Sequence, residues 1–286
     1  MTDLAPLPAV LVAPLLARAY EEDLGQAGDV TTDSVVPAGA SAKVAARARR
    51  PGRVAGAAIA RQAFHTIDPA LDVTLVTPDG ASIAPGETIL TVAGPAQAIL
   101  TAERVALNFL GHLSGIATLT AAFVERVGNH KAKIVCTRKT TPTLRAVEKF
   151  AVRAGGGVNH RFGLYDGVLI KDNHIAVAGS ITAAVAAARE RSGHMMRVEV
   201  ETDTLNQVEE ALAAQADIIL LDNMTPETLR EAVTRVAGRA ITEASGGVTL
   251  ETVAAIAETG VDLISSGALT HSAPTLDIGL DFEAML

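Results

Sequence analysis

The chain has 286 residues, of which 49% are hydrophobic and 20% charged, a composition that supports a sizeable core and excludes an intrinsically disordered protein. Aromatic residues make up only 3% and there is no Trp, so the core must consist of Ala, Val, Leu and Ile, as is typical of helices packed on parallel strands. The formal net charge of −8 excludes a general nucleic-acid binder, because neutralising phosphates needs a broad basic face.

The start of the chain and its single cysteine bear on the compartment. Residues 1–16 are apolar but include Asp3 and no basic segment, so we do not expect a signal peptide. No run of about 18 uninterrupted apolar residues occurs, so no membrane-spanning helix is expected. Cys136 alone excludes an intramolecular disulfide and a cysteine-based zinc site. One cysteine fits a reducing compartment, and we expect a cytoplasmic protein.

The first 115 residues mix helices with short strands. Apolar spacing predicts helices at 7–23, 57–67 and 96–113, the last of which begins after Pro95. Short apolar segments between turn residues predict strands at 41–48, 53–56, 73–76 and 88–92. Turns are expected at Asp79-Gly80 and Pro85-Gly86.

From about residue 133, short apolar runs alternate with Ala-rich helical stretches. The runs predict strands at 134–136, 168–170, 198–200, 218–221, 240–242 and 263–264. This alternation predicts βαβ units and a parallel sheet. Because no Gly-x-Gly-x-x-Gly pattern follows the first strand, an α/β barrel is favoured over a dinucleotide-binding sheet. The run Gly155-Gly156-Gly157 follows a helix and is a weak nucleotide fingerprint.

Positive charge is concentrated in residues 131–171. This window holds nine Lys and Arg residues and only two acids, within an otherwise acidic chain. A concentrated basic site of this kind suits a small polyanion. A solvated basic helix over residues 142–154 is the alternative for three of the cations: Arg145, Lys149 and Arg153.

Each predicted strand of the second half is followed by a polar or glycine residue. In a parallel barrel all strand carboxyl ends open on the face that holds the active site. We therefore expect one mouth to be ringed by Arg138, Lys139, Lys171, Glu201, Asp222, Ser245 and Gly267. The cations fit carboxylates and phosphates, and the two acids fit sugar hydroxyls, Mg²⁺ or a developing positive charge. The alternative is a buried salt-bridge network, which we expect for Glu199 on the opposite side of its strand from Glu201.

Several longer motifs resemble those of the quinolinate phosphoribosyltransferases. The three most specific are Thr137-Arg138-Lys139-Thr140-Thr141-Pro142, Gly155-Gly156-Gly157-Val158-Asn159-His160-Arg161 and Leu169-Ile170-Lys171-Asp172-Asn173-His174. Further matches are Leu100-Thr101-Ala102-Glu103-Arg104, Ser114-Gly115-Ile116-Ala117-Thr118, Leu221-Asp222-Asn223, Ser245-Gly246-Gly247 and Gly267-Ala268-Leu269-Thr270-His271. The resemblance covers essentially the whole chain. It departs at Cys136 and Thr143, where the family more often has Asp and Gly.

The resemblance implies an α/β fold in which an incomplete parallel α/β barrel is preceded by an N-terminal α/β sandwich domain. The sandwich would take residues 1–115, with a C-terminal return at 274–286, and the barrel would take 116–273. A homodimer or larger homo-oligomer is also implied. In it, the N-terminal domain of one subunit caps the neighbour's barrel, and Arg104 reaches the neighbour's site.

The implied reaction joins quinolinate to 5-phosphoribosyl-1-diphosphate in the presence of Mg²⁺. It releases pyrophosphate and CO₂ and gives nicotinate mononucleotide for NAD biosynthesis. Neither nucleic acid nor a membrane is an implied partner.

Carried over motif by motif, the resemblance also implies roles for individual residues. The pyridine carboxylates and neighbouring phosphates would be bound by Arg104, Thr137, Arg138, Lys139, His160, Arg161 and Lys171. Glu201 and Asp222 would hold the ribose hydroxyls and the metal and stabilise an oxocarbenium-like ribose; together with Lys139 and Lys171 they form the predicted catalytic set. The 5′-phosphate would lie against Ser245, Gly246, Gly247, Ser266, Gly267 and Ala268.

Three alternatives stay open on the sequence. The chain could be a paralogue of the same fold that serves molybdenum uptake or takes a different pyridine acid, although the full set of cations favours quinolinate. Lys171 at a strand end is also where a Schiff-base aldolase would carry its amine. The third alternative is a non-catalytic polyanion-binding or regulatory protein.

Overall fold

The computed structural model describes residues 4–286, which form two compact units. Unit 1 combines three stretches of the chain, up to residue 121, 141–156 and 272–286, and unit 2 comprises 122–140 and 157–271. The sequence-based boundaries at 115 and 273 stay a prediction. Residues 1–3 of the predicted first domain lie outside the described residues.

Unit 1 contains a four-stranded antiparallel sheet with the order β12-β1-β5-β3. Its strands are β1 (Ser41–Ala48), β3 (Asp72–Leu75), β5 (Thr88–Pro95) and β12 (Ile278–Met285). A separate pair is formed by β2 (Gly52–Arg53) and β4 (Ser82–Ile83). The helices are α1 (Ala9–Leu24), α2 (Val30–Val35), α3 (Ala57–Ile67), most of α4 (Ala96–Val127) and α5 (Arg145–Ala154).

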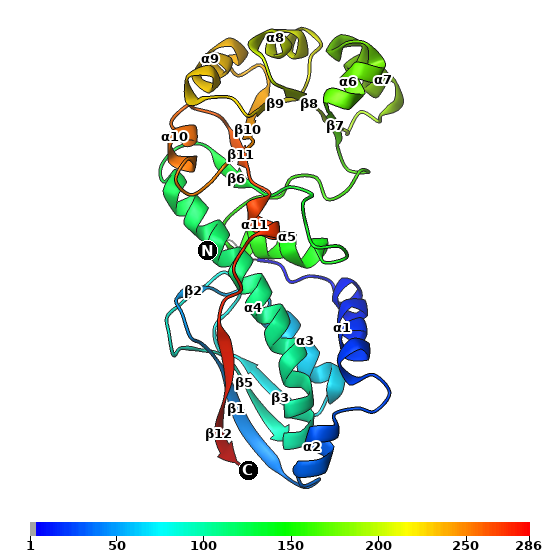
Figure 1. Ribbon diagram of the computed structural model, residues 1–286, viewed down its shortest axis with the longest axis vertical. Coiled ribbons are helices and arrows are strands. Elements are labelled where there is room, and N and C mark those ends of the chain that lie inside the picture. The colour runs from blue at the N-terminus through cyan, green and yellow to red at the C-terminus, as the bar shows by residue number, and fades with distance from the viewer. Residues whose placement is uncertain (1–3) are drawn as a thin grey trace. The chain divides into compact units, whose positions relative to one another are not determined.

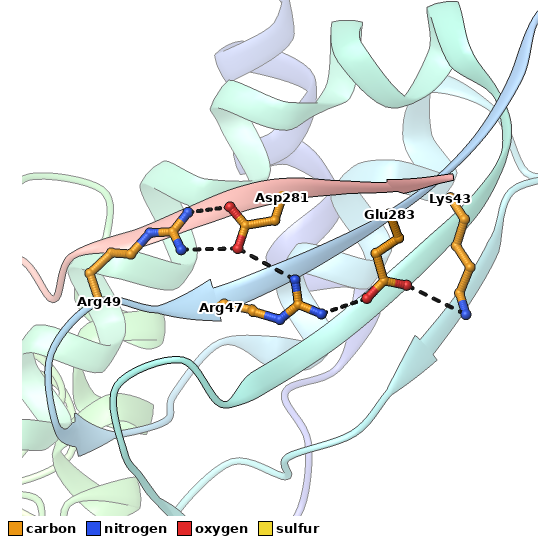
Figure 2. Close-up of polar contacts among 5 residues, drawn as sticks. All are labelled: Lys43, Arg47, Arg49, Asp281 and Glu283. Atoms are coloured by element: carbon orange, nitrogen blue, oxygen red, sulfur yellow. Dashed lines mark hydrogen bonds and ion pairs between the residues drawn. The ribbon is translucent and has the colours of Figure 1, made fainter. Parts of the chain in front are cut away.

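The C-terminal strand β12 lies along β1 and is tied to it by charges on the outer face of the sheet (Figure 2). Arg49 donates to both carboxylate oxygens of Asp281, at 2.9 and 2.5 Å, and holds the pKa of Asp281 below its usual range. Arg47 bridges Asp281 and Glu283, and Lys43 lies 3.5 Å from Glu283. These pairs are partly exposed to solvent and each contributes little, but together they form a network that links the two strands.

The Asp79-Gly80 turn in unit 1 also caps a helix. Asp79 Oδ1 accepts a hydrogen bond from the backbone N–H of Ala57, at 2.8 Å, where α3 begins. Burial raises the pKa of Asp79 above its ordinary value, although the backbone hydrogen bonds oppose this. The turn therefore satisfies a helix N–H group that has no partner within the helix.

Helix α4 is the one described helix that is long and apolar enough to cross a membrane by length and composition. More than half of its most apolar window, 56%, is buried inside the protein, and Ile99, Leu110, Leu113 and Ile116 are fully buried. It therefore behaves as a core helix, which passes the same test.

Helix α5 differs from the solvated basic helix considered above. Arg153 is exposed, but the Lys149 side chain is completely buried, so the solvated reading is wrong for that residue. Gly155, the first glycine after α5, allows close packing against α4: a Cβ atom there would lie 2.6 Å from the Cβ atom of Thr120. This close approach accounts for the start of the glycine run without a nucleotide.

Unit 2 is built on a six-stranded parallel sheet with the order β6-β11-β10-β9-β8-β7. The strands are β6 (Lys133–Val135), β7 (Val168–Ile170), β8 (Val198–Thr202), β9 (Ile218–Asp222), β10 (Ile241–Ser245) and β11 (Leu263–Ser265). Within the described chain β6 and β7 are the two ends of the sheet and do not pair, so the barrel is incomplete, and the predicted fold class is confirmed.

The helices of unit 2 alternate with these strands along the chain, and most of them lie on the outer side of the sheet (Figure 1). They are α6 (Asp172–Ala178), α7 (Ile181–Arg191), α8 (Leu205–Ala213), α9 (Pro226–Val236), α10 (Val253–Ala257) and α11 (Ala268–His271). All six strands predicted from the apolar runs are present in this unit. The carboxyl ends of the strands therefore open on one face, which positions the candidate site.

Candidate active site

A cavity of about 780 Å³ opens at the carboxyl ends of the strands and is lined entirely by unit 2. The structure brings nearly all the predicted site residues into its wall: Thr137, Arg138, Lys139, His160, Arg161, Lys171, Glu201, Asp222, Ser245, Gly246, Gly247, Ser266, Gly267 and Ala268. The exception is Arg104, which is exposed on α4 in unit 1 and is not among the lining residues.

The register of the sheet sets the level of the acidic residues in the cavity. Asp222, at the end of β9, pairs with Ser245 at the end of β10. Two residues deeper, on the same face of the sheet, Glu201, Leu220 and Glu243 align across β8, β9 and β10, and all three line the cavity. The predicted strand-end residues therefore lie at similar levels because the strands are parallel and paired in this register.

The cations of the cavity are held by specific contacts. The Arg161 Nη1 group donates to the carbonyl oxygen of Gly167 at 2.7 Å, whereas its Nε atom is buried and has no hydrogen-bond partner among residues 4–286. Burial and the nearby Arg138 lower the pKa of Arg161. Lys171 forms an ion pair with Glu201. A Schiff-base role for Lys171 is disfavoured, because the ion pair stabilises its ammonium and a nucleophilic amine must be neutral.

The loop after β10 has a backbone that only certain residues allow. Gly246 and Gly247 have φ angles of 91° and 59°, and Asn223 after β9 has a φ of 53°. A Cβ atom at Gly246 would overlap the side chain of Asn223. Glycine is therefore required at position 246, and the loop presents bare backbone to the cavity, as suits the close approach of a phosphate.

Beneath the cations lies a buried group formed by His160, Glu199 and Glu243. His160 Nε2 is 2.9 Å from Glu199 Oε2 and 3.8 Å from Glu243 Oε1. The two glutamates are 3% and 1% exposed. The expectation that Glu199 lies on the opposite side of its strand from Glu201 is wrong, because residues i and i+2 of a strand point to the same face. Glu199 is in a buried network, as expected, but on the inner side of the sheet.

The hydrogen bonds of His160 determine where its proton lies. The backbone N–H of Arg161 donates to His160 Nδ1 at 2.8 Å, so Nδ1 carries no hydrogen. The neutral ring then has its hydrogen on Nε2, facing Glu199. His160 was predicted to contact substrate carboxylates with the cations. That contact stays a prediction, and within the described chain both ring nitrogens already face protein groups.

The same three residues are close enough to hold a metal ion, since one ligand atom from each lies within 4.8 Å of the others. A metal-bound histidine uses a bare nitrogen and donates its other ring N–H to a partner. In His160 the bare nitrogen, Nδ1, already accepts from the Arg161 backbone. The geometry therefore favours a proton between these groups over a cation.

Glu201 and Asp222 are better placed for a divalent cation. Both are only partly buried and line the open cavity at the ends of adjacent strands. Mg²⁺ prefers oxygen ligands and is usually held by one or two carboxylates together with substrate phosphates. These two carboxylates fit Mg²⁺ if Glu201 gives up its ion pair with Lys171.

Other lining residues were absent from the sequence-based set: Leu169, Leu220, Asn223, Glu243, Val248, Thr249, Ser265 and His271. Glu243 is the most consequential, because it is an acid at the floor. Period-2 alternation back from Ser245 would have identified it, just as alternation back from Glu201 identifies Glu199. Asn223 and His271 belong to the motifs quoted above, but no role followed from those motifs.

A buried acid in unit 1 holds the chain just beyond Lys139 and Thr140. Glu148, on α5, accepts hydrogen bonds from the backbone N–H of Thr141 at 3.1 Å and from His112 Nε2 at 2.9 Å. The side chain is fully buried. Sequence reasoning missed this anchor, because the acid lies within a basic stretch.

Comparison with known proteins places the chain in a family. Residues 116–281 match the family described as quinolinate phosphoribosyl transferase, C-terminal domain, and residues 29–114 match the N-terminal domain. A probable nicotinate-nucleotide pyrophosphorylase [carboxylating] of Bacillus subtilis is 48% identical over 93% of this chain and 92% of its own length. A quinolinate phosphoribosyltransferase [decarboxylating] 1b of Nicotiana tabacum is 45% identical over 95% of this chain and 82% of that protein.

Solved structures agree over the whole chain. NadC from Streptococcus pyogenes superposes with a TM-score of 0.93 at 41% identity, covering 98% of this chain and 100% of that one. The nicotinate-nucleotide pyrophosphorylase from Francisella tularensis gives a TM-score of 0.94 at 35% identity, with 99% and 100% covered. The resemblance deduced from the motifs is thereby confirmed, and the chain belongs to the quinolinate phosphoribosyltransferase family.

Proposed function

We propose that this chain transfers the phosphoribosyl group of 5-phosphoribosyl-1-diphosphate to quinolinate with loss of CO₂. The products are nicotinate mononucleotide and pyrophosphate, and the reaction serves de novo NAD biosynthesis. Family membership supports this activity, since similar proteins named quinolinate phosphoribosyltransferase or nicotinate-nucleotide pyrophosphorylase match nearly the full chain.

The observation that carries the proposal is the cationic wall of the cavity. Arg138, Lys139, Arg161 and Lys171 line a single cavity, and the buried Arg161 Nε has no hydrogen-bond partner within the described residues. An unpaired buried cationic donor is costly unless an anion satisfies it. Quinolinate brings two carboxylates and the phosphoribosyl donor brings phosphates, so the substrates supply the missing partners.

The remaining cavity residues fit the sugar and its phosphates. Glu201 and Asp222 face the ribose, where they accept hydrogen bonds from hydroxyls and stabilise positive charge that develops at C1′. The Ser245-Gly246-Gly247 loop and the segment Ser266-Gly267-Ala268 take the 5′-phosphate through backbone N–H groups. These roles follow from the resemblance and agree with the cavity's chemistry.

The reaction then needs positioning more than covalent chemistry. The pyridine nitrogen attacks C1′ as the pyrophosphate oxygen leaves, and the ring nitrogen becomes cationic. The bond between C2 and its carboxylate breaks, CO₂ departs, and the cationic ring stabilises the electron pair at C2 until a proton replaces the carboxylate. Lys139 and Lys171 hold the anions in register.

We further propose that Glu201 and Asp222 would hold a Mg²⁺ ion that accompanies the diphosphate, which would screen the charge of the leaving group. The enzyme would be cytoplasmic and would form a homodimer or larger homo-oligomer with shared sites. Arg104 supports the shared site, because it is exposed on α4 and, in the described chain, has no carboxylate within ion-pair distance.

Incubation of the purified protein with quinolinate, phosphoribosyl diphosphate and Mg²⁺ tests the proposal. We expect CO₂, pyrophosphate and a pyridine mononucleotide in equal amounts. Omitting Mg²⁺ or adding a chelator should suppress all three. A protein that binds these anions without releasing pyrophosphate would instead be a binding or regulatory protein.

Nicotinate, which lacks the 2-carboxylate, should be a poor substrate. Without that anion, cations at the site stay unpaired, and such sites reject the truncated analogue by about 10⁴-fold or more. Comparison of kcat/KM for the two acids, with pyrophosphate release as a common readout, provides the check. Comparable values would contradict the assignment of the cations to two carboxylates.

A further inference from the structure

The floor of the cavity contains an acid that the proposed mechanism does not use. Glu243, on β10, lines the cavity but is only 1% exposed. Its Oε1 atom has no hydrogen-bond partner among residues 4–286 and lies 3.8 Å from His160 Nε2. A buried acid with an unsatisfied oxygen beneath an anion site requires an explanation.

Most of the groups that face Glu243 are acidic or neutral, and His160 is the one whose charge would lower the pKa of Glu243. His160 is neutral by its hydrogen bonds, with Nε2–H directed at Glu199. Glu199 is itself buried and has an unsatisfied Oε1 atom. From β11, Ser265 donates a hydrogen bond to Glu243. Glu201 shares its row across β9, and in the described chain no Lys or Arg forms an ion pair with Glu243.

Two buried carboxylates this close cannot both be ionised without compensation. Glu199 Oε2 lies 2.9 Å from His160 Nε2, whereas Glu243 Oε1 has no hydrogen-bond partner among residues 4–286. Glu243 is the one that keeps a proton.

We propose that Glu243 is a positioning residue that holds a proton in the cavity floor, and that this proton is required for tight binding of the quinolinate dianion above it. The inference rests on the proposed function, because it takes quinolinate as the ligand. It assigns pH dependence to a group that contacts no reacting atom.

The burial of Glu243 supports the proposal that it holds a proton. Burial, and then the charge of Glu199, raise the pKa of Glu243 to about 7, although His160 and the hydrogen bond from Ser265 oppose the shift. A dianion bound above the floor raises this pKa further, because it disfavours a second negative charge nearby. Bound quinolinate therefore prefers the protonated enzyme. The affinity for quinolinate is therefore highest below about pH 7. Above that pH it falls as Glu243 loses its proton, by at most about tenfold per pH unit.

Steady-state kinetics from pH 6 to pH 9, with each substrate varied in turn while the other is saturating, provide the first test. In the wild type we expect the KM for quinolinate to rise more than about fivefold above pH 7, while the KM for phosphoribosyl diphosphate changes little. In Glu243→Gln, whose neutral amide mimics the protonated acid, the rise should fall below about twofold. Glu258→Gln, at an exposed position in the same unit, should keep the wild-type profile.

Calorimetry separates this proton from other titrating groups, including His271, which also lines the cavity. Quinolinate is titrated at pH 8 in buffers of different ionisation enthalpy, with pyrophosphate present to occupy the diphosphate region. The wild type should take up more protons than Glu243→Gln. Equal uptake, or an unchanged KM profile in a folded Glu243→Gln protein, would overturn the role of Glu243.

Glu199→Gln is a second variant in case the first fails to fold. It keeps an acceptor for His160 but removes the charge that favours the proton on Glu243. The rise in KM should then begin at lower pH, and an unchanged onset would contradict the coupling. A wild type that makes no mononucleotide at any pH would overturn the proposed function itself. A wild type that makes it with a flat profile would overturn only the inference about Glu243.

Discussion

Thr143, in the loop after the Thr-Arg-Lys motif, adopts a backbone conformation that suits glycine. Its φ angle is 70°, which is costly for a β-branched residue. The resemblance predicts Gly at this position, so the departure in sequence is also a departure from the preferred backbone. The side chain is exposed, which means that little packing compensates for the strain.

Replacing Thr143 with Gly should therefore stabilise the protein by about 1 kcal/mol, since relief of the left-handed strain exceeds the added flexibility of the unfolded chain. Urea unfolding followed by circular dichroism measures the difference. Thr143→Ala is the matched control, because it removes the side chain but keeps a Cβ atom. A gain in Ala as large as in Gly would mean that the backbone strain is not the cause.

Glu201→Ala and Asp222→Ala should lower kcat more than they weaken quinolinate binding. Their proposed partner is the ribose and its developing charge, which are stabilised only in the transition state. Separate kcat and KM values for each substrate, with quinolinate affinity from titration, provide the check. Lost quinolinate binding with normal turnover at saturation would contradict these roles.

The residues of the cavity rim could be predicted from the sequence, but the contacts within its floor could not. Glu201 and Asp222 end their strands and stand beside other polar residues, so their position signals function. Glu199 and Glu243 lie inside strands, flanked by Val198 and Ala244, and are hidden in apolar runs. Period-2 alternation places both on the same face as Glu201 and Ser245, but their pairing through His160, from a distant loop, is visible only in the structure.

Among the elements, α3 depends on a cap that comes from another part of the chain. Asp79→Ala removes the acceptor for the Ala57 N–H and should lower the free energy of unfolding by about 1–2 kcal/mol. Asp79→Asn retains an acceptor oxygen and should lose less than half of that. Thermal and urea unfolding of the three proteins compare them. Equal losses in Ala and Asn would point to the charge instead of the hydrogen bond.

The apolar spacing of the sequence predicted those helices and strands whose ends are set by neighbouring residues in the chain. Helix α3 and strand β1 have their predicted bounds. The strand expected at 53–56 shrinks to Gly52–Arg53, because the N–H of Ala55 donates to Ser114 Oγ instead of to a neighbouring strand. Helix α4 continues past 113 to Val127, since no breaker ends it there. Both differences arise from contacts or continuity that a short window of sequence does not contain.

At the scale of the whole molecule, the shared site can be tested by mixing subunits. Arg104→Ala and Arg138→Ala chains should each be nearly inactive alone. If Arg104 acts in the neighbour's site, a mixed dimer has both defects in one site and an intact second site. Activity should then return towards half of the wild-type value per dimer.

Mass spectrometry must first establish that mixed dimers form. Confirmed exchange without recovery would place Arg104 in its own subunit's site, or outside any site, and would leave the cavity chemistry unchanged. An Arg138→Ala chain mixed with Lys171→Ala provides the control. Both residues line the same cavity of one chain, so that mixture should not recover.

The pairing of β12 with β1 has a consequence for synthesis on the ribosome. Strand β1 emerges early, whereas its neighbour β12 is the last described strand to be translated. One edge of β1 therefore stays open while the whole barrel unit is being made, and open strand edges invite association with other nascent chains. Lys43 and Arg47 on β1, with Arg49 just beyond it, are charges that discourage such pairing during this interval. The residues that later bind Asp281 and Glu283 thus also oppose association at this edge of β1 before β12 has been made.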